Sequence, residues 1–153
     1  MSAPVSNAAS DTSARAATLS LLARAPGVRL ATLLPDLPPF DWLRRPEVGA
    51  VMLRGRMGAG GGAPFNLGEM TVTRCALRLA DGTVGHAAVQ GRDKGHATRV
   101  AVIDALMQGE DAVRIETAVL APLRAEEAAR RRLRAEKAAA TKVEFFTLVR
   151  GED

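Results

Sequence analysis

The sequence has few aromatic residues, one cysteine and two histidines. Aromatic residues make up 3% of the 153, with one Trp and no Tyr, so we expect a mostly aliphatic core. Proteins that bind single-stranded nucleic acid stack its bases on aromatic side chains, and this sequence supplies hardly any. A single cysteine cannot form an internal disulfide, which fits a reducing compartment. We therefore expect a cytoplasmic protein without a nucleic-acid partner.

Long apolar segments are missing as well. No run of about 18 apolar residues is present, so the sequence predicts no membrane-spanning helix and no membrane partner. The N-terminus has Asp11 and no basic region ahead of an apolar one, which is unlike a signal peptide. A net charge of +4 and a pI near 10.2 permit binding to a polyanion, although the arginine content alone raises the pI.

The most informative stretch that is present, residues 69–90, is typical of a hairpin. Asp81 and Gly82 favour a two-residue turn, because such a turn needs positive φ angles that these residues tolerate. This turn would pair Leu79 with Val84, and directly opposed residues share a face of the sheet. We expect one buried face of Cys75, Leu77, Leu79, Val84 and His86, and one outer face of Arg74, Ala76, Arg78, Ala87 and Val89.

A helix is predicted directly after the hairpin, over residues 94–108. Asp93 can cap this helix by accepting hydrogen bonds from the first free backbone N–H groups. Its apolar stripe has a histidine at the start and consists of His96, Val100, Ile103 and Met107.

The loop before this helix is the candidate binding site. We expect it to bring together Arg74, Arg92, Asp93, Lys94 and His96. Arginine forks and a helix N-terminus suit a phosphonate or a triphosphate. The alternative is a structural Arg–Asp pair with helix capping, or a contact with a neighbouring subunit. The sequence leaves both interpretations open.

Two other patterns look like sites and have simpler explanations. Residues 58–64 match a dinucleotide fingerprint as a string, but a strand rather than a helix should follow, so no pyrophosphate site is predicted. We interpret this segment as a mobile connection, or as a loop that closes over an anion or a partner beside Arg56. Cys75 and His86 would share a face, but a metal site needs two more ligands, so a buried thiol beside a hydrogen-bonded histidine is expected.

These patterns predict an α+β fold with a mainly antiparallel sheet of about five strands, packed helices and a helical N-terminal arm. Residues 1–11 are expected to be disordered, residues 12–47 to form the helical arm with a proline-rich linker, and residues 48–153 to form the α+β domain. The three strands expected besides the hairpin span residues 48–57, 113–119 and 143–150.

The N-terminal arm is predicted to hold two short helices, over residues 12–25 and 28–34. The linker that follows, residues 35–46, has too many prolines for regular structure. Its apolar side chains are expected to pack on the chain's own sheet, with docking on a partner as the alternative. They are Leu37, Phe40 and Trp42.

A long exposed helix is predicted over residues 122–140. Two pairs of opposite charge four residues apart support it, Glu126 with Arg130 and Glu127 with Arg131. We interpret its basic run, residues 130–134, as a solvated face or a subunit contact.

A set of short segments, spaced in order along the chain from about residue 48 to the C-terminus, matches a known pattern. They are Gly55-Arg56-Met57-Gly58, Thr73-Arg74, Gln90-Gly91-Arg92-Asp93-Lys94, His96-Ala97, Ile103-Asp104-Ala105-Leu106-Met107-Gln108, Leu120-Ala121-Pro122-Leu123 and Phe145-Phe146-Thr147-Leu148-Val149-Arg150-Gly151. In these segments the chain resembles the PhnG family of the bacterial carbon–phosphorus lyase system. The N-terminal third resembles that family only in its helical character.

The resemblance implies a role in the complex that joins a phosphonate to the ribose triphosphate of ATP with release of adenine. It implies subunits of the PhnH, PhnI and PhnJ types as partners, and two copies of this chain in the assembly. In that family the nucleosidase chemistry is associated with PhnI and the radical iron–sulfur chemistry with PhnJ, while PhnG is required with PhnH for the first step. ATP would then be a substrate of the complex, with no cofactor bound by this chain alone.

We therefore expect an accessory subunit without catalytic or metal-binding residues of its own. The alternative is a stand-alone module that binds a nucleotide or anion through the loop from Arg92 to His96. The residues predicted to bind a ligand or to form an interface are Arg56, Arg74, Gln90, Arg92, Asp93, Lys94 and His96.

Overall fold

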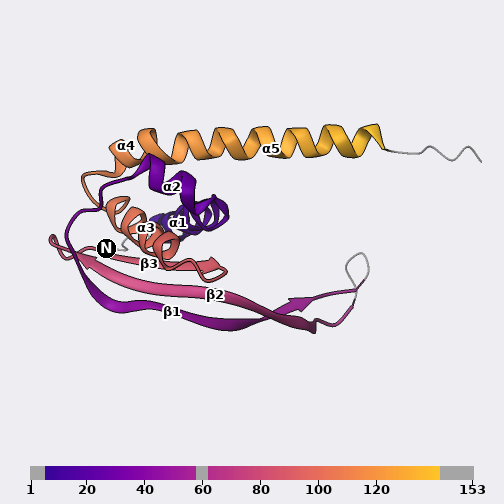
Figure 1. The fold of residues 1–153 in the computed structure, drawn as a ribbon, viewed down its shortest axis with the longest axis horizontal. Coiled ribbons are helices and arrows are strands. Elements are labelled where there is room, and N and C mark those ends of the chain that lie inside the picture. The colour runs from indigo at the N-terminus through magenta and orange to yellow at the C-terminus, as the bar shows by residue number, and fades with distance from the viewer. Residues whose placement is uncertain (1–5, 58–61, 142–153) are drawn as a thin grey trace, which may run out of the picture.

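The computed structural model describes residues 6–57 and 62–141, and the structural statements below refer to this part of the chain. It has an α+β fold in which helices pack on one antiparallel sheet (Figure 1). The sheet has three strands in the order β1-β2-β3. The elements are α1 (Ser6–Arg24), α2 (Gly27–Leu33), β1 (Phe40–Gly55), β2 (Phe65–Leu79), β3 (Val84–Gln90), α3 (Lys94–Leu106), α4 (Ala112–Ile115), the π-helical turn η1 (Glu116–Leu120) and α5 (Ala121–Ala140).

The core lies between the sheet and α3, with α1 and α2 packed against α3 (Figure 1). The C-terminal half of α3 is enclosed, since every residue over 100–106 is buried. The strands contribute Cys75, Leu77, Ala87 and Val89 to this core. At Gly85 the strand backbone meets the helix directly, because an added Cβ would lie 1.8 Å from the carbonyl oxygen of Ala101. Glycine within this strand therefore permits the close approach of α3.

The turn between β2 and β3 holds one more residue than predicted. The backbone N–H of Leu79 donates to the carbonyl oxygen of Thr83 at 2.9 Å, and that of Gly82 donates to the Leu79 carbonyl at 3.0 Å. The loop therefore contains three residues, and Gly82 takes the left-handed conformation with φ of +90° that such loops need.

The longer turn shifts the pairing, so the predicted faces are wrong along β3. Cys75 pairs with Ala87, and both point into the core together with Val89. His86 lies on the outer face of the sheet instead and is exposed. A shift of one residue moves every side chain of a strand to the opposite face, which explains why all of β3 is affected.

β1 is much longer than the strand predicted over residues 48–57. It starts at Phe40, so the prediction of an irregular linker is wrong from that residue onward. Pro46 is tolerated because β1 is an edge strand and its pairing with β2 shifts register on both sides of Arg44. Packing of the apolar linker residues on the chain itself is confirmed, since all three contact the core: Leu37, Phe40 and Trp42.

The prediction of a strand over residues 113–119 is wrong. The segment is helical, with α4 leading into η1 and η1 leading into α5. Ile115 and Val119 are fully buried four residues apart, whereas Val113 is 79% exposed. The last predicted strand, over residues 143–150, lies outside the described residues. Three of the five predicted strands are therefore present in the part of the chain described here.

The helices follow the sequence more closely. α2, α3 and α5 are confirmed within two residues at each end. α1 already begins at Ser6, so part of the segment expected to be disordered is helical. In α5, Glu127 pairs with Arg131 as predicted, at 3.0 Å, whereas Glu126 pairs with Arg29 of α2 at 2.7 Å.

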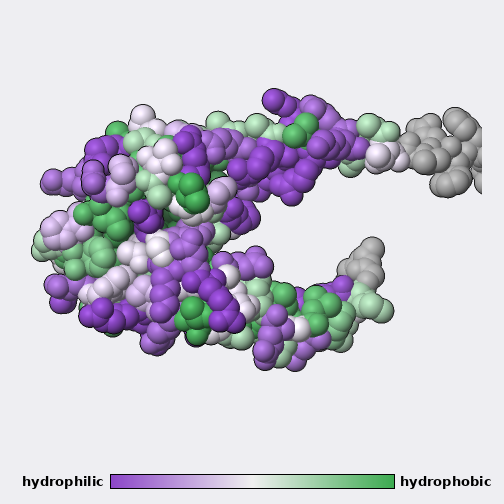
Figure 2. Space-filling view, viewed as in Figure 1, coloured by the Kyte–Doolittle hydropathy of each residue, from purple (hydrophilic) through white to green (hydrophobic). Residues whose placement is uncertain are grey.

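Two elements extend from the core on the same side (Figure 1). One is a two-stranded segment, residues 50–55 of β1 and 65–71 of β2, where β3 no longer pairs with β2. We call it the β-ribbon. The other is the C-terminal half of α5, and Figure 2 shows an open notch between the two. Among the described residues, no helix combines the length and the apolar character needed to cross a lipid bilayer.

Candidate functional site

Two of the predicted site residues, the exposed Asp93 and the buried His96, are held by contacts within the fold. Asp93 caps α3 as predicted, because its Oδ1 accepts a hydrogen bond from the backbone N–H of His96 at 2.8 Å. His96 is 8% exposed, and its Nε2 lies 2.9 Å from the carbonyl oxygen of Leu22 in α1. Gly27 of α2 packs on both residues, since an added Cβ would lie 2.9 Å from Asp93 Oδ2. Asp93 and His96 thus join α1, α2 and α3.

The remaining predicted residues are exposed and do not all come together. Arg74 lies on the face of the sheet opposite α3, because its neighbour Cys75 points toward that helix. Arg56 follows the end of β1, at the far end of the β-ribbon. Their use in binding or at an interface stays a prediction. The three that stay near the start of α3 are Gln90, Arg92 and Lys94.

A cleft of about 550 Å³ lies between α5 and the end of β3. Glu127 on its wall pairs with Arg24 at 3.0 Å, and the hydrogen bond from Arg24 lowers the pKa of Glu127 below its ordinary value. Arg130 and Arg134 lie on the same wall, and neither forms an ion pair with a described residue. This side of the cleft therefore keeps positive charge. The lining includes Gln90, His96, Glu127, Arg130 and Arg134.

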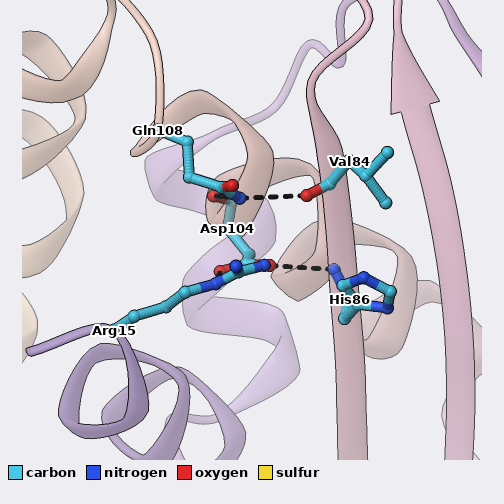
Figure 3. Close-up of polar contacts among 5 residues, drawn as sticks. All are labelled: Arg15, Val84, His86, Asp104 and Gln108. Carbon is cyan, nitrogen blue, oxygen red and sulfur yellow. Dashed lines mark hydrogen bonds and ion pairs between the residues drawn. The ribbon is translucent and has the colours of Figure 1, made fainter. Parts of the chain in front are cut away.

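A buried carboxylate, Asp104 of α3, is the centre of a second polar cluster (Figure 3). It is 2% exposed, and Arg15 of α1 donates to its two oxygens from Nε at 2.9 Å and from Nη2 at 2.7 Å. The backbone N–H of His86 donates to the same carboxylate at 2.9 Å. Gln108 Nε2 donates to the carbonyl oxygens of Val84 at 2.9 Å and of Asp104 at 2.8 Å. This cluster ties α1, α3 and β3 together.

A cavity of about 680 Å³ adjoins this cluster and is lined in part by Arg15, Asp104 and Gln108. Both oxygens of Asp104 already accept charge-assisted or backbone hydrogen bonds. The carboxylate is therefore arranged as an anchor between elements and not as a free base facing the cavity.

Cys75 is enclosed and separate from His86. The predicted shared face is wrong, because Cys75 points to α3, where its Sγ donates to the carbonyl oxygen of Ala97 at 3.4 Å. Burial raises the pKa of the Cys75 thiol to about 11. Within residues 6–57 and 62–141, no group of three or more His, Cys, Asp and Glu side chains is placed to hold a metal ion.

We expect the stability of the folded chain to fall as the pH rises above about 9, in part because of Cys75. Its pKa is about 11 when folded, against an ordinary value of 9.0, so between these values the unfolded chain loses the proton first. This contribution is intact below pH 9 and is lost as the pH rises through 11. The free energy of unfolding, measured from pH 8 to 11, should therefore fall more steeply than in Cys75→Ala. Parallel curves would contradict this prediction.

The chain is similar to known proteins over most of its length. Residues 13–151 match the family model described as phosphonate metabolism protein PhnG. The match includes the N-terminal helices and so extends beyond the region of resemblance found in the sequence. A protein of Rhizobium meliloti (strain 1021), named alpha-D-ribose 1-methylphosphonate 5-triphosphate synthase subunit PhnG, is 45% identical over 124 residues. The alignment covers 78% of this chain and 76% of that relative.

Proposed function

The chain belongs to the PhnG family of phosphonate metabolism proteins, and on this basis we propose that it is a non-catalytic subunit of an alpha-D-ribose 1-methylphosphonate 5-triphosphate synthase. The complex would transfer the ribose triphosphate of ATP to an alkylphosphonate and release adenine. Its other members would be subunits of the PhnH, PhnI and PhnJ types, with two copies of this chain, in the cytoplasm. The name of the Rhizobium relative supports the role as a subunit.

The observation that carries this proposal is the β-ribbon. Met52 and Leu53 are neighbours on one strand, so their side chains point to opposite faces, and they are 49% and 41% exposed. On the other strand Phe65 is 41% exposed and Leu67 is 63% exposed. A two-stranded ribbon alone is marginally stable in water, and this one offers apolar side chains on both faces. These features fit an arm that inserts into a partner protein.

A supporting role fits the contacts that the ionisable residues make within the fold. Asp93 caps α3, His96 contacts a backbone carbonyl, and Asp104 is bound by Arg15. Each of these side chains holds elements together, and the thiol of Cys75 is kept protonated by burial. This arrangement supports a scaffold over a self-contained active site. The surface residues proposed to contact partner subunits are Arg56, Arg74, Gln90, Arg92 and Lys94.

The alternative function, a stand-alone nucleotide- or anion-binding module, finds no support in the comparisons. Its proposed loop also has less to offer a ligand than the sequence suggested. Asp93 and His96 are engaged in hydrogen bonds within the fold, and Arg92 and Lys94 carry the positive charge of the exposed part of the loop.

We expect the double variant Met52→Ser/Leu53→Ser to lose binding to the complex while the chain keeps its fold. Burial of one such side chain contributes about 1.5 kcal/mol, so losing both should weaken assembly about 100-fold or more. The test is affinity purification of the tagged chain, co-expressed with subunits of the PhnH, PhnI and PhnJ types, with mass spectrometry and sizing.

Val113→Ser is the matched control, because Val113 is also apolar and 79% exposed but lies in α4, away from the β-ribbon. This variant should assemble like the wild-type chain. Equal assembly of all three proteins would show that the β-ribbon is not the contact. A wild-type chain that purifies alone would contradict the proposed function itself.

A further inference from the structure

One face of α5 changes its chemistry where the helix leaves the core. Leu123 on this face is 1% exposed and packs in the core, and Glu127, four residues later, is 16% exposed at its side chain. At the helical spacing of three and four residues the same face continues through Arg130, Arg134 and Lys137. All three are exposed. The face that begins in the core thus ends as a row of cations, which we call the basic face.

No ion pair within the described chain neutralises the basic face. The other charges of α5 are largely paired: Glu126 with Arg29, Glu127 with Arg24 and Arg131, and Arg132 with Glu136. Arg130, Arg134 and Lys137 take part in no ion pair with any residue that the structure describes. Figure 2 shows hydrophilic side chains along the side of α5 that faces the notch.

An apolar side chain adjoins these cations. Leu133 is 52% exposed and lies one helical turn from both Arg130 and Lys137. An exposed leucine beside a row of cations fits a partner segment that offers carboxylates together with an apolar contact. Such a combination is typical of an amphipathic helix docking on another helix.

We propose that the basic face of α5 binds an acidic, amphipathic segment of another subunit in the assembly, an inference that rests on the proposed function. The cations from Arg130 to Lys137 extend over seven residues, about 10 Å along the helix axis, which exceeds the reach of one compact anion. Two of them, Arg130 and Arg134, also line the cleft opposite Gln90, whose amide can hydrogen-bond the same segment.

A second copy of this chain fits the basic face less well than a different protein does. The chain carries 21 Lys and Arg against 17 Asp and Glu, and many carboxylates near its helices are engaged in ion pairs. Two basic faces brought together would repel each other. An acidic surface on a different subunit supplies the charge complementarity that orients and speeds assembly.

The test compares two charge reversals on opposite sides of α5. Arg134 lies on the basic face, and Arg132 lies about 200° around the same helix. Both side chains are exposed, so the two substitutions Arg134→Glu and Arg132→Glu differ mainly in the face they change. We expect Arg134→Glu to weaken assembly with the co-expressed subunits about tenfold at low salt, and the difference from wild type to shrink at 0.5 M salt. Arg132→Glu should assemble like wild type.

Carbodiimide cross-linking of the purified wild-type complex provides an independent measurement. It joins lysine amines to carboxylates in direct contact, so Lys137 should link to Asp or Glu residues of a different subunit. Equal assembly of Arg134→Glu and Arg132→Glu, or links from Lys137 only to another copy of this chain, would overturn the inference while leaving the proposed function intact. A wild-type chain that binds no other subunit would overturn the proposed function, and the inference with it.

Discussion

Gly85→Ala is expected to destabilise the folded chain strongly. The new Cβ would lie 1.8 Å from the carbonyl oxygen of Ala101 and 3.0 Å from the Cβ of Ala105. Both atoms belong to α3, whose residues here are fully buried, so the helix cannot shift without opening the core. A clash with backbone atoms is harder to relieve than a clash between side chains. We therefore expect the free energy of unfolding to fall by about 3 kcal/mol or more. A domain of this size is stable by only about 5–15 kcal/mol.

The measurement is chemical denaturation followed by the fluorescence of Trp42, the one tryptophan, which packs against the core. Gly95→Ala is the matched control, because an added Cβ there would meet its nearest atom, Asp93 Oδ1, at 3.4 Å. Gly95 is an exposed residue of α3, so alanine should leave stability unchanged or raise it by up to about 1 kcal/mol. Similar midpoints for Gly85→Ala and the wild type would refute the close packing of α3 on β3.

Asp104→Ala should produce the next largest loss of stability. Removing the carboxylate deletes two hydrogen bonds from the Arg15 guanidinium and one from the backbone N–H of His86. Breaking a buried ion pair by removing one partner costs about 3–5 kcal/mol, but the Arg15 side chain is 40% exposed and regains water. We therefore expect a loss of about 2–3 kcal/mol in the same denaturation experiment.

Asp111→Ala controls for the loss of an Asp–Arg pair as such. Asp111 contacts Arg114 at 2.8 Å, but the two side chains are 47% and 57% exposed, so water replaces the lost contact. This variant should be nearly as stable as the wild type. If both aspartate variants lost the same amount, the anchoring role of Asp104 would have to be rejected.

The sequence predicted the helices well where side chains mark their ends. Asp93 caps α3 as expected, because an aspartate directly before an apolar helical stripe is a typical N-cap. The cluster around Asp104 was missed although a signal was present. An acidic residue inside the apolar run 100–106 requires a buried partner. That partner, Arg15, lies 89 residues away in the chain, and no local pattern indicates it.

The errors in the sheet have a different cause. One extra residue in the turn, with Thr83 accepting from Leu79, was enough to reverse the faces of β3 and separate His86 from Cys75. The spacing of Ile115 and Val119 is compatible with a strand and with a helix, so tertiary packing decided between them. Arg74 was assigned to the candidate site because the predicted register placed it opposite Val89, just before the loop, whereas in the structure it pairs with Ala88.

The π-helical turn η1 gives α5 its rotational phase. A π-helical turn takes up more residues than an α-helical turn, and each residue of an α-helix advances the direction of the side chain by about 100°. η1 lies between Ile115 and Leu123, which are both buried in the core, so the number of residues in this turn sets the direction in which the exposed part of α5 presents its side chains. One residue inserted or removed between Glu116 and Leu120 would leave the helix and its composition almost unchanged, yet would turn its cations away from the notch. The length of η1, and not only the identity of its side chains, therefore determines which way the cations of α5 point.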